Sequence, residues 1–165
     1  MDKLKALWNS VVGVLDPAGD WVALLPIRLL MAYEFFKAGL TKFNGSNWFG
    51  NIQDNFDLPF NLIPVDISWF LSTSTEIIGG LFLYVGQFTR IWALIQINKT
   101  ILAIFAEHRP DEWSSLAELW KGYAITDKGF GNYRVPLLFL AMLFPLLFIG
   151  GGKLSVDHVL AKKLR

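Results

Sequence analysis

The chain has 165 residues, of which 53% are hydrophobic and only 18% are charged, and it contains no cysteine. About a quarter of the residues of an average soluble domain are charged, so this chain has few residues to cover a soluble surface. The composition excludes a disordered chain, a disulfide-stapled scaffold and a thiolate metal site. A net charge of +1 gives no field for binding nucleic acid. We therefore expect a small integral membrane protein with a single domain, residues 1–165.

The N-terminal segment predicts an amphipathic helix that lies flat on the membrane surface. Apolar residues recur at helical spacing from Leu4 to Leu15, and polar residues stand between them. Asp16-Pro17 is expected to stop this helix. Packing of the helix on a neighbouring protein is the alternative.

Four apolar segments follow, and each is treated as a membrane span. The first is expected over about 20–43, with Asp20 as its N-cap and a kink at Pro26. The second begins near the cap residue Asp66 and covers about 66–86. The remaining two are expected over about 90–107 and 135–150.

Two further short helices are expected outside the spans. A capping-box pattern at residues 115–118 predicts a surface helix, and Ser155 is expected to cap a short basic tail helix. The fold class is therefore all-α, an integral membrane four-helix bundle with short amphipathic surface helices.

The distribution of basic residues predicts the orientation. The two long loops carry both signs of charge, whereas the ends and the tight turn near residue 88 are basic. The positive-inside rule then places both termini in the cytoplasm. The basic residues on that side are Lys3, Lys5, Arg90, Lys153, Lys162, Lys163 and Arg165.

Ionisable residues inside the spans mark a candidate site, because each costs about 2.5–3.5 kcal/mol to insert. Glu76 lies about 15 Å beyond Asp66, and Lys99 lies about 14 Å beyond Arg90 on the antiparallel neighbour. Their depths match, so we expect the two side chains to pair. The alternative is that such an ion pair only fixes the register of the helices.

The first span adds further charges at similar depth, and we expect all of them to form one cluster. The expected proton carriers, and hence catalytic residues, are Glu34 and Glu76. The expected ligand-binding residues are Arg28, Lys37, Lys99, Gly79 and Gly80. The two glycines admit either a neighbouring helix backbone or the planar ring of a ligand. Lys37 and Lys42 have the alternative of extending to the outer membrane surface.

No haem or metal site is expected. His108 and His158 fall at opposite ends of the spans, about 30 Å apart, so they cannot be the two axial ligands of one haem. Neither histidine has a partner at metal-ligand spacing.

Three stretches carry a resemblance to a known family. They are RLLMAYEFFKAGLTKF from Arg28, TEIIGGLFLYVGQFTRIWAL from Thr75 and GGGKLSVD from Gly150. In this order they resemble the DoxX family of small bacterial membrane proteins. The stretches NFDLPF and AEHRPDEWSSLAE are similar to its HvfX-like branch, which is encoded beside iron-dependent peptide-modifying enzymes.

The resemblance implies a four-span inner-membrane protein that is linked to quinones, since the founding member is similar to a subunit of a thiosulfate:quinone oxidoreductase. It supplies no agreed active site. Three consecutive glycines replace the Gly-Pro-Gly form common at the end of the family pattern. The recurrent family positions correspond to Arg28, Lys42, Glu76, Gly79, Gly80, Gly86, Arg90, Gly152 and Asp157.

Three functions stay open at this point. The first is a quinone-binding subunit of a membrane redox or stress-response system, which is not catalytic alone because a protein partner supplies the electrons. The second is a non-catalytic membrane scaffold for peptide-modifying enzymes. The third is a carrier for a small solute or peptide. The lipid bilayer is an expected partner in each case, and a homo-oligomer is open.

Overall fold

The structure is a computed structural model that describes residues 1–108, 115 and 134–164. In these ranges the chain forms α-helices, short 3-10 turns and one π-helical turn, and it forms no strand. The predicted all-α fold class is confirmed. The surface helix predicted at residues 115–118 lies outside the described residues, apart from Ser115 itself.

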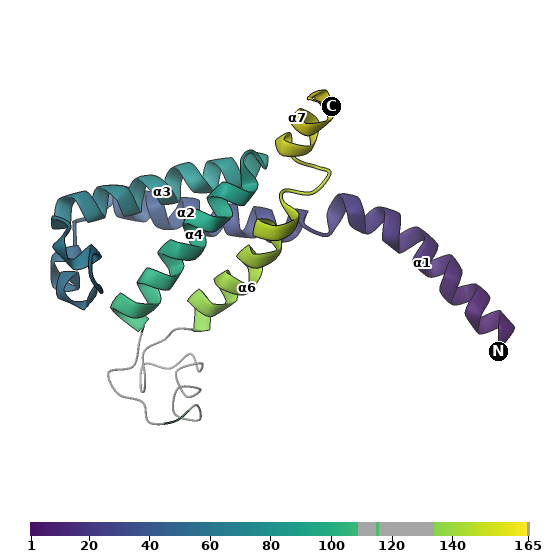
Figure 1. Cartoon of the computed structure of the whole chain (residues 1–165), viewed down its shortest axis with the longest axis horizontal. Helices are drawn as coiled ribbons and strands as arrows, with labels where there is room; N and C mark the ends of the chain where they lie inside the picture. The colour runs from purple at the N-terminus through teal and green to yellow at the C-terminus, as the bar shows by residue number, and fades with distance from the viewer. Residues whose placement is uncertain (109–114, 116–133, 165) are drawn as a thin grey trace.

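The N-terminal helix α1 (Asp2–Val22) projects away from the rest of the molecule, and none of its residues is buried (Figure 1). The predicted stop at Asp16-Pro17 is wrong, because Pro17 lies inside α1. Proline removes the backbone bond to the carbonyl of Gly13, but α1 is exposed here, so water can take the place of that bond.

The break in the chain comes later, at Ala23 and Leu24, and α2 (Leu25–Asn44) begins after it. Pro26 lies in the first turn of α2, where its missing N–H is not needed, so the predicted kink inside a span is wrong. Asp20 is not the cap of this helix, because it lies within α1. Its carboxylate instead receives a hydrogen bond from Lys153 Nζ at 2.7 Å.

The predicted second, third and fourth segments correspond to helices in the structure. Ser155 caps the tail helix as predicted, whereas Pro64 rather than Asp66 is the N-cap of the second segment. The bounds after α2 are η1 (Phe49–Asn51), η2 (Gln53–Asn55), η3 (Phe60–Leu62), α3 (Val65–Val85), α4 (Thr89–Ala103), the π-helical turn η4 (Ile104–His108), α6 (Arg134–Ile149) and α7 (Val156–Lys163).

Helices α2, α3, α4 and α6 form a closed four-helix bundle. Helix α2 packs against α3 and α6, and α4 packs against the same two helices. The start of α2, the α3–α4 turn and the end of α6 meet at one end of the bundle, which we call the turn end. Arg28 Nη2 donates to Leu154 O there at 2.7 Å. Both α1 and α7 leave from the turn end, so the two termini lie at the same end of the bundle (Figure 1).

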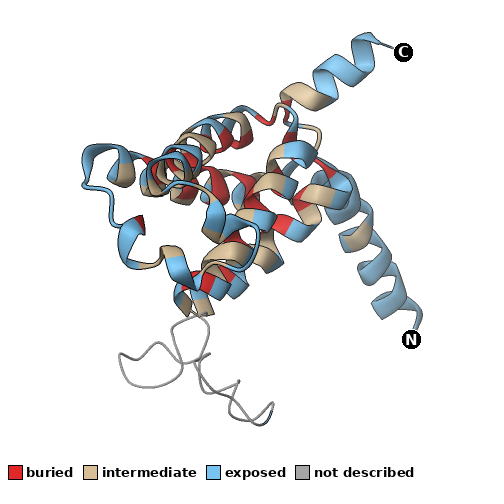
Figure 2. Cartoon of the chain, turned by 60° about the vertical axis from the view of Figure 1, so that its left-hand side comes forward, coloured by how far each residue is buried: buried red, intermediate tan, exposed pale blue. Residues whose placement is uncertain are grey.

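The bundle is apolar on the outside and carries several polar residues inside. Buried residues line the interior of the bundle, while its outer faces are exposed (Figure 2). Large apolar side chains are exposed on each of the four helices, including Leu30, Leu40, Phe70, Leu81, Ile91, Leu94, Leu138 and Phe144. The buried polar residues are Arg28, Thr73, Glu76, Thr89, Gln96, Thr100 and Ser155.

By length and composition alone, fewer helices qualify as candidate membrane spans. Among the described residues, one helical stretch, Asp2–Asn44, is long and apolar enough to cross a membrane, and it lies near the N-terminus. Helix α6 is apolar but shorter. One such stretch carries little weight alone, because core helices of soluble proteins and signal sequences have the same properties.

Glycines set the close approach of α2 and α3. A Cβ atom on Gly80 would lie 2.8 Å from the backbone nitrogen of Phe36 and 2.9 Å from the carbonyl oxygen of Ala32. A Cβ atom on Gly39 would lie 2.8 Å from the backbone nitrogen of Ile77. These neighbours are backbone atoms that cannot turn aside, so both positions require glycine for this packing.

The packing at Gly80 predicts a stability effect. Gly80→Ala should lower the free energy of unfolding by about 1–3 kcal/mol, because α2 and α3 must separate to admit the methyl group. Unfolding in detergent micelles, followed by circular dichroism, measures the change. Gly13→Ala is the matched control, since nothing lies within 4 Å of its Cβ position, and it should be neutral or slightly stabilising. Equal stability of the two variants would contradict this packing.

Candidate functional site

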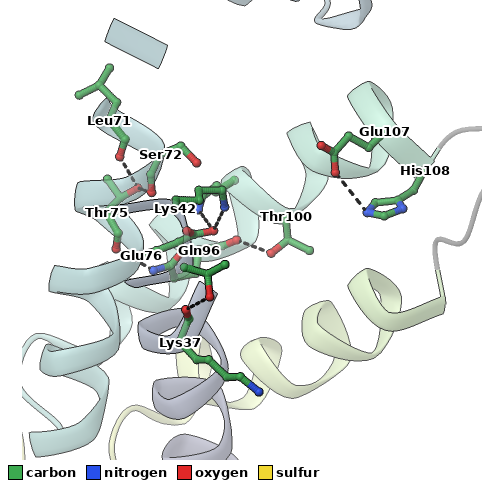
Figure 3. Close-up of polar contacts among 12 residues, drawn as sticks. Lys37, Lys42, Leu71, Ser72, Thr75, Glu76, Gln96, Thr100, Glu107 and His108 are labelled. Atoms are coloured by element: carbon green, nitrogen blue, oxygen red, sulfur yellow. Dashed lines mark hydrogen bonds and ion pairs between the residues drawn. The ribbon is translucent and has the colours of Figure 1, made fainter. Parts of the chain in front are cut away.

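One carboxylate oxygen joins three helices inside the bundle. Lys42 Nζ of α2 donates to Glu76 Oε1 of α3 at 2.6 Å, and Lys99 Nζ of α4 contacts the same oxygen (Figure 3). Glu76 is only 5% exposed and lies near the middle of α3. The predicted pairing of Glu76 with Lys99 is confirmed. We refer to these three residues as the triad.

Helix geometry explains how the three side chains meet. Side chains on a helix tilt toward its N-terminus, so Lys42, in the last turn of α2, extends back along α2. Helix α3 runs in the opposite direction, so Glu76 tilts toward Lys42. Gly39 lets the α3 backbone come close here, since a Cβ atom on Gly39 would lie 2.8 Å from Glu76 Cβ.

A polar side chain of α4 fixes the register beside the triad. Gln96 is fully buried, and its Nε2 atom donates to the backbone oxygen of Thr75 at 2.9 Å. Thr100 Oγ1 donates to the backbone oxygen of Gln96 at 2.7 Å. Gln96 and Lys99 of α4 therefore both turn toward α3.

Gly79 and Gly80 are closed by neighbouring helices. The Cβ position of Gly79 is taken up by the amide of Gln96 and by the ring of Trp92 at 3.0 Å. Gly80 faces the backbone of α2. Of the two predicted uses of these glycines, the structure supports close helix packing, and the space for a planar ring beside them is filled by Gln96, Trp92 and Phe36.

Three residues that were expected in the same cluster lie elsewhere. Lys37 is exposed, and its Nζ atom lies 5.6 Å from the centroid of the Tyr33 ring (Figure 3). Glu34 is half-buried and makes no contact with the triad in the described structure. Arg28 is buried at the turn end. Depth arithmetic alone misplaced them, because it does not say which way around the helix a side chain points.

Arg28 belongs to a second polar cluster, which holds the tail of the chain on the bundle. Asp157 Oδ1 accepts the backbone N–H of Phe88 at 2.7 Å, and Oδ2 accepts that of Thr89 at 2.9 Å. The Asp157 N–H in turn donates to Gly86 O at 2.9 Å. The carboxylate therefore caps the start of α4 from a distant part of the sequence.

Gly86 is required at this turn for two reasons. Its backbone is left-handed, with φ of 70°, and a Cβ atom there would run into the Arg28 guanidinium. Only glycine adopts this turn conformation and also leaves room for the Arg28 guanidinium that packs against it.

A surface groove of about 1000 Å³ also opens at the turn end. It is lined by α1, the α3–α4 turn, residues 149–155 and α7. Arg90 and the ion pair between Asp20 and Lys153 are on its walls, whereas no triad residue lines it. The groove is thus separate from the triad.

Sequence reasoning missed the role of Lys42, which was named as a recurrent family position but not as a site residue, with the outer membrane surface as an alternative place for it. The tilt of side chains toward the helix N-terminus was the signal that could have placed it beside Glu76. Thr73, which is buried on α3, was also not among the predicted site residues. No group of His, Asp or Glu that could hold a metal ion occurs among the described residues.

The triad predicts a non-additive stability effect. Glu76→Leu should lower the free energy of unfolding by about 3–5 kcal/mol, because two ammonium groups are left without a counter-charge. Replacing all three members together, as Lys42→Met, Glu76→Leu and Lys99→Met, should cost less than the single change. Chemical denaturation in micelles measures both, with Glu34→Gln as a control outside the triad. Additive losses would show that the three charges do not act together.

The family of the chain follows from comparison with known proteins. A sequence model of the DoxX family matches residues 23–109, which include α2, α3, α4 and the whole triad. An uncharacterized protein of Haemophilus influenzae is 42% identical over 144 residues, which cover 87% of this chain and 87% of that protein. No solved structure matches the chain. On the family match and on this relative, the chain belongs to the membrane-associated DoxX family.

Proposed function

We propose that the chain is a multi-pass inner-membrane protein with four spans, α2, α3, α4 with η4, and α6, and with both termini in the cytoplasm. Supporting observations are the exposed apolar side chains on the outer faces of all four helices and the buried charges within. A soluble bundle would have the opposite arrangement. Helices α2 and α3 are each about 30 Å long, which is the thickness of the hydrocarbon core.

The orientation rests on the turn end and its charges. Both termini lie at the turn end, together with Arg90 and Lys153, and the basic tail residues follow in α7. Basic residues favour the cytoplasmic side. In this arrangement α1 lies along the cytoplasmic membrane surface, with Leu4, Trp8 and Val11 in contact with lipid.

We further propose that the triad binds the headgroup of a quinone. The observation that carries this proposal is a buried carboxylate near the middle of α3 that is held by two ammonium groups, with Glu107 close enough to interact electrostatically with Lys42. Quinone carbonyl oxygens accept hydrogen bonds, and both lysines keep N–H groups that Glu76 does not use. The Lys42 side chain is 15% exposed, which offers a ligand an approach from the edge of the bundle, whereas the Lys99 Nζ atom is buried beside Glu76.

The chemistry needs a partner. Reduction of a quinone takes up two electrons and two protons, and Glu76 is the group placed to pass protons to the headgroup. The electrons come from a protein partner, a redox subunit of the same membrane system. The chain is then a quinone-binding and proton-handling subunit, not a catalyst alone.

A non-catalytic scaffold is the second candidate, and the glycine packing favours it. Gly79 and Gly80 are filled by neighbouring helices, so the ring of a quinone has to lie nearer Lys42 and Lys99. A scaffold uses the triad only to fix the bundle, and its partners are the peptide-modifying enzymes that the HvfX-like resemblance implies.

Binding measurements separate the two candidates. Wild-type protein in lipid nanodiscs should bind a short-chain benzoquinone, and Glu76→Gln and Lys99→Met should each weaken binding at least about tenfold. Lys37→Gln is the control, because Lys37 is an α2 cation that points away from the triad. Unchanged binding in folded Glu76→Gln protein would remove the quinone site and leave the scaffold.

The orientation is tested separately with single cysteines, because the natural chain has none. In intact cells with a permeabilised outer membrane, an impermeant thiol reagent should label Asn51→Cys in η1. Lys162→Cys in α7 should react only after the inner membrane is opened. Labelling in the reverse order would overturn the proposed orientation.

A further inference from the structure

The triad is surrounded by buried acceptor atoms that have no donor. Among the described residues, no hydrogen-bond partner reaches Glu76 Oε2, Gln96 Oε1 or Thr73 Oγ1, and Lys99 Nζ is likewise buried with only its ion-pair contact to Glu76. The side chains of Glu76, Gln96 and Thr73 are more than nine-tenths buried. Thr73 and Glu76 are one turn apart on α3, and Gln96 packs against the same helix at Gly79. Buried polar atoms are nearly always hydrogen-bonded, so this group of acceptors with a buried ammonium beside it points to a missing partner that can both donate and accept.

The orientation of the Gln96 amide follows from its neighbour. Its Nε2 atom faces the backbone oxygen of Thr75, which can only accept a hydrogen bond. Exchanging the amide oxygen and nitrogen would place two acceptors face to face. The free atom of Gln96 is therefore its oxygen, and it is an acceptor like Glu76 Oε2.

The donors at the triad are the two ammonium groups. The Nζ atoms of Lys42 and Lys99 both contact Glu76 Oε1 and keep other N–H groups. Lys99 Nζ is buried, like the acceptor atoms of Glu76 and Gln96. A headgroup bound at the triad thus meets donors and acceptors together.

This combination of polar atoms distinguishes the two redox forms of a quinone. A carbonyl oxygen accepts hydrogen bonds but donates none, so the oxidised form can use the lysines and leaves the buried acceptors unsatisfied. A hydroxyl group does both: it can accept from an ammonium group and donate to Glu76 Oε2 or Gln96 Oε1. A charged acceptor makes the stronger of these bonds.

We infer that the triad binds the reduced, hydroxyl-bearing form of the headgroup in preference to the oxidised form. This inference rests on the proposed quinone site and names which form the site selects. Tighter binding of the reduced form raises the reduction potential of the bound couple. A tenfold preference corresponds to about 30 mV for a two-electron couple. The site would therefore draw electrons from a partner toward the bound quinone.

Three probes test the preference without any mutation. They are a decyl-substituted benzoquinone, the corresponding hydroquinone under anaerobic conditions, and the dimethyl ether of that hydroquinone, which keeps the ring but cannot donate. Wild-type protein in nanodiscs should bind the hydroquinone at least about tenfold more tightly than either of the others, because only it donates to the buried acceptors.

Variants then assign the preference to named atoms. Gln96→Leu removes one buried acceptor and should reduce the preference severalfold, and Glu76→Gln should reduce it further. Lys37→Gln is the matched control and should leave the ratio unchanged. The melting temperature of each variant shows whether it is folded, and the wild-type comparison stands even where a variant does not fold.

The outcomes separate this inference from the proposed function. Equal binding of quinone, hydroquinone and ether, lost in Glu76→Gln, would overturn the preference and leave the quinone site in place. Tighter binding of the oxidised form would overturn it in the same way. If none of the three probes binds to the folded wild-type protein, the quinone site itself is wrong and the preference falls with it.

Discussion

A single carboxylate oxygen, Glu76 Oε1, holds two ammonium groups from two other helices, and the centre of the bundle is organised around it. In a low-dielectric interior an unpaired charge has a high free energy. Separating the helices would leave these charges unpaired, so the ion pairs hold the three helices together. The same arrangement leaves buried polar atoms without hydrogen-bond partners. The feature that fixes the register of three helices is therefore also the place where we propose that a polar headgroup binds.

The remaining constraints serve to keep that arrangement in place. Gly39 and Gly80 bring α2 against α3, and Gln96 fixes α4 beside them. At the turn end, Asp157 caps α4 and thereby ties the tail to the bundle. The positions that recur in the DoxX resemblance fall at these places, in the triad, at the close glycine contacts and around the turn end. This gives a physical reason for the pattern, since charge pairing, helix contact and the capped turn each admit few residue types.

Much of the helical plan was predictable, because apolar length and turn residues are local signals. Glu76 and Lys99 could be paired from depth on antiparallel neighbours. Rotation about a helix and the direction of a side chain were not predictable in this way. Lys42 was therefore not placed beside Glu76, whereas Arg28 and Lys37 were placed there although they lie elsewhere. The helix end predicted at Pro17 was also wrong. Proline is tolerated there because α1 is exposed and water can bond to the backbone carbonyl that proline leaves without a partner.

The central claim is that Glu76 carries a negative charge shared by two lysines inside the bundle. Solid-state NMR on protein in lipid bilayers, with labelled glutamate carboxyl carbons and lysine Nζ nitrogens, measures this directly. Glu76 is assigned by its loss in Glu76→Gln. The account predicts an ionised carboxyl shift and dipolar couplings to both Lys42 and Lys99 that correspond to N···O contact within about 4 Å. A protonated carboxyl, or a coupling to only one lysine, would contradict it.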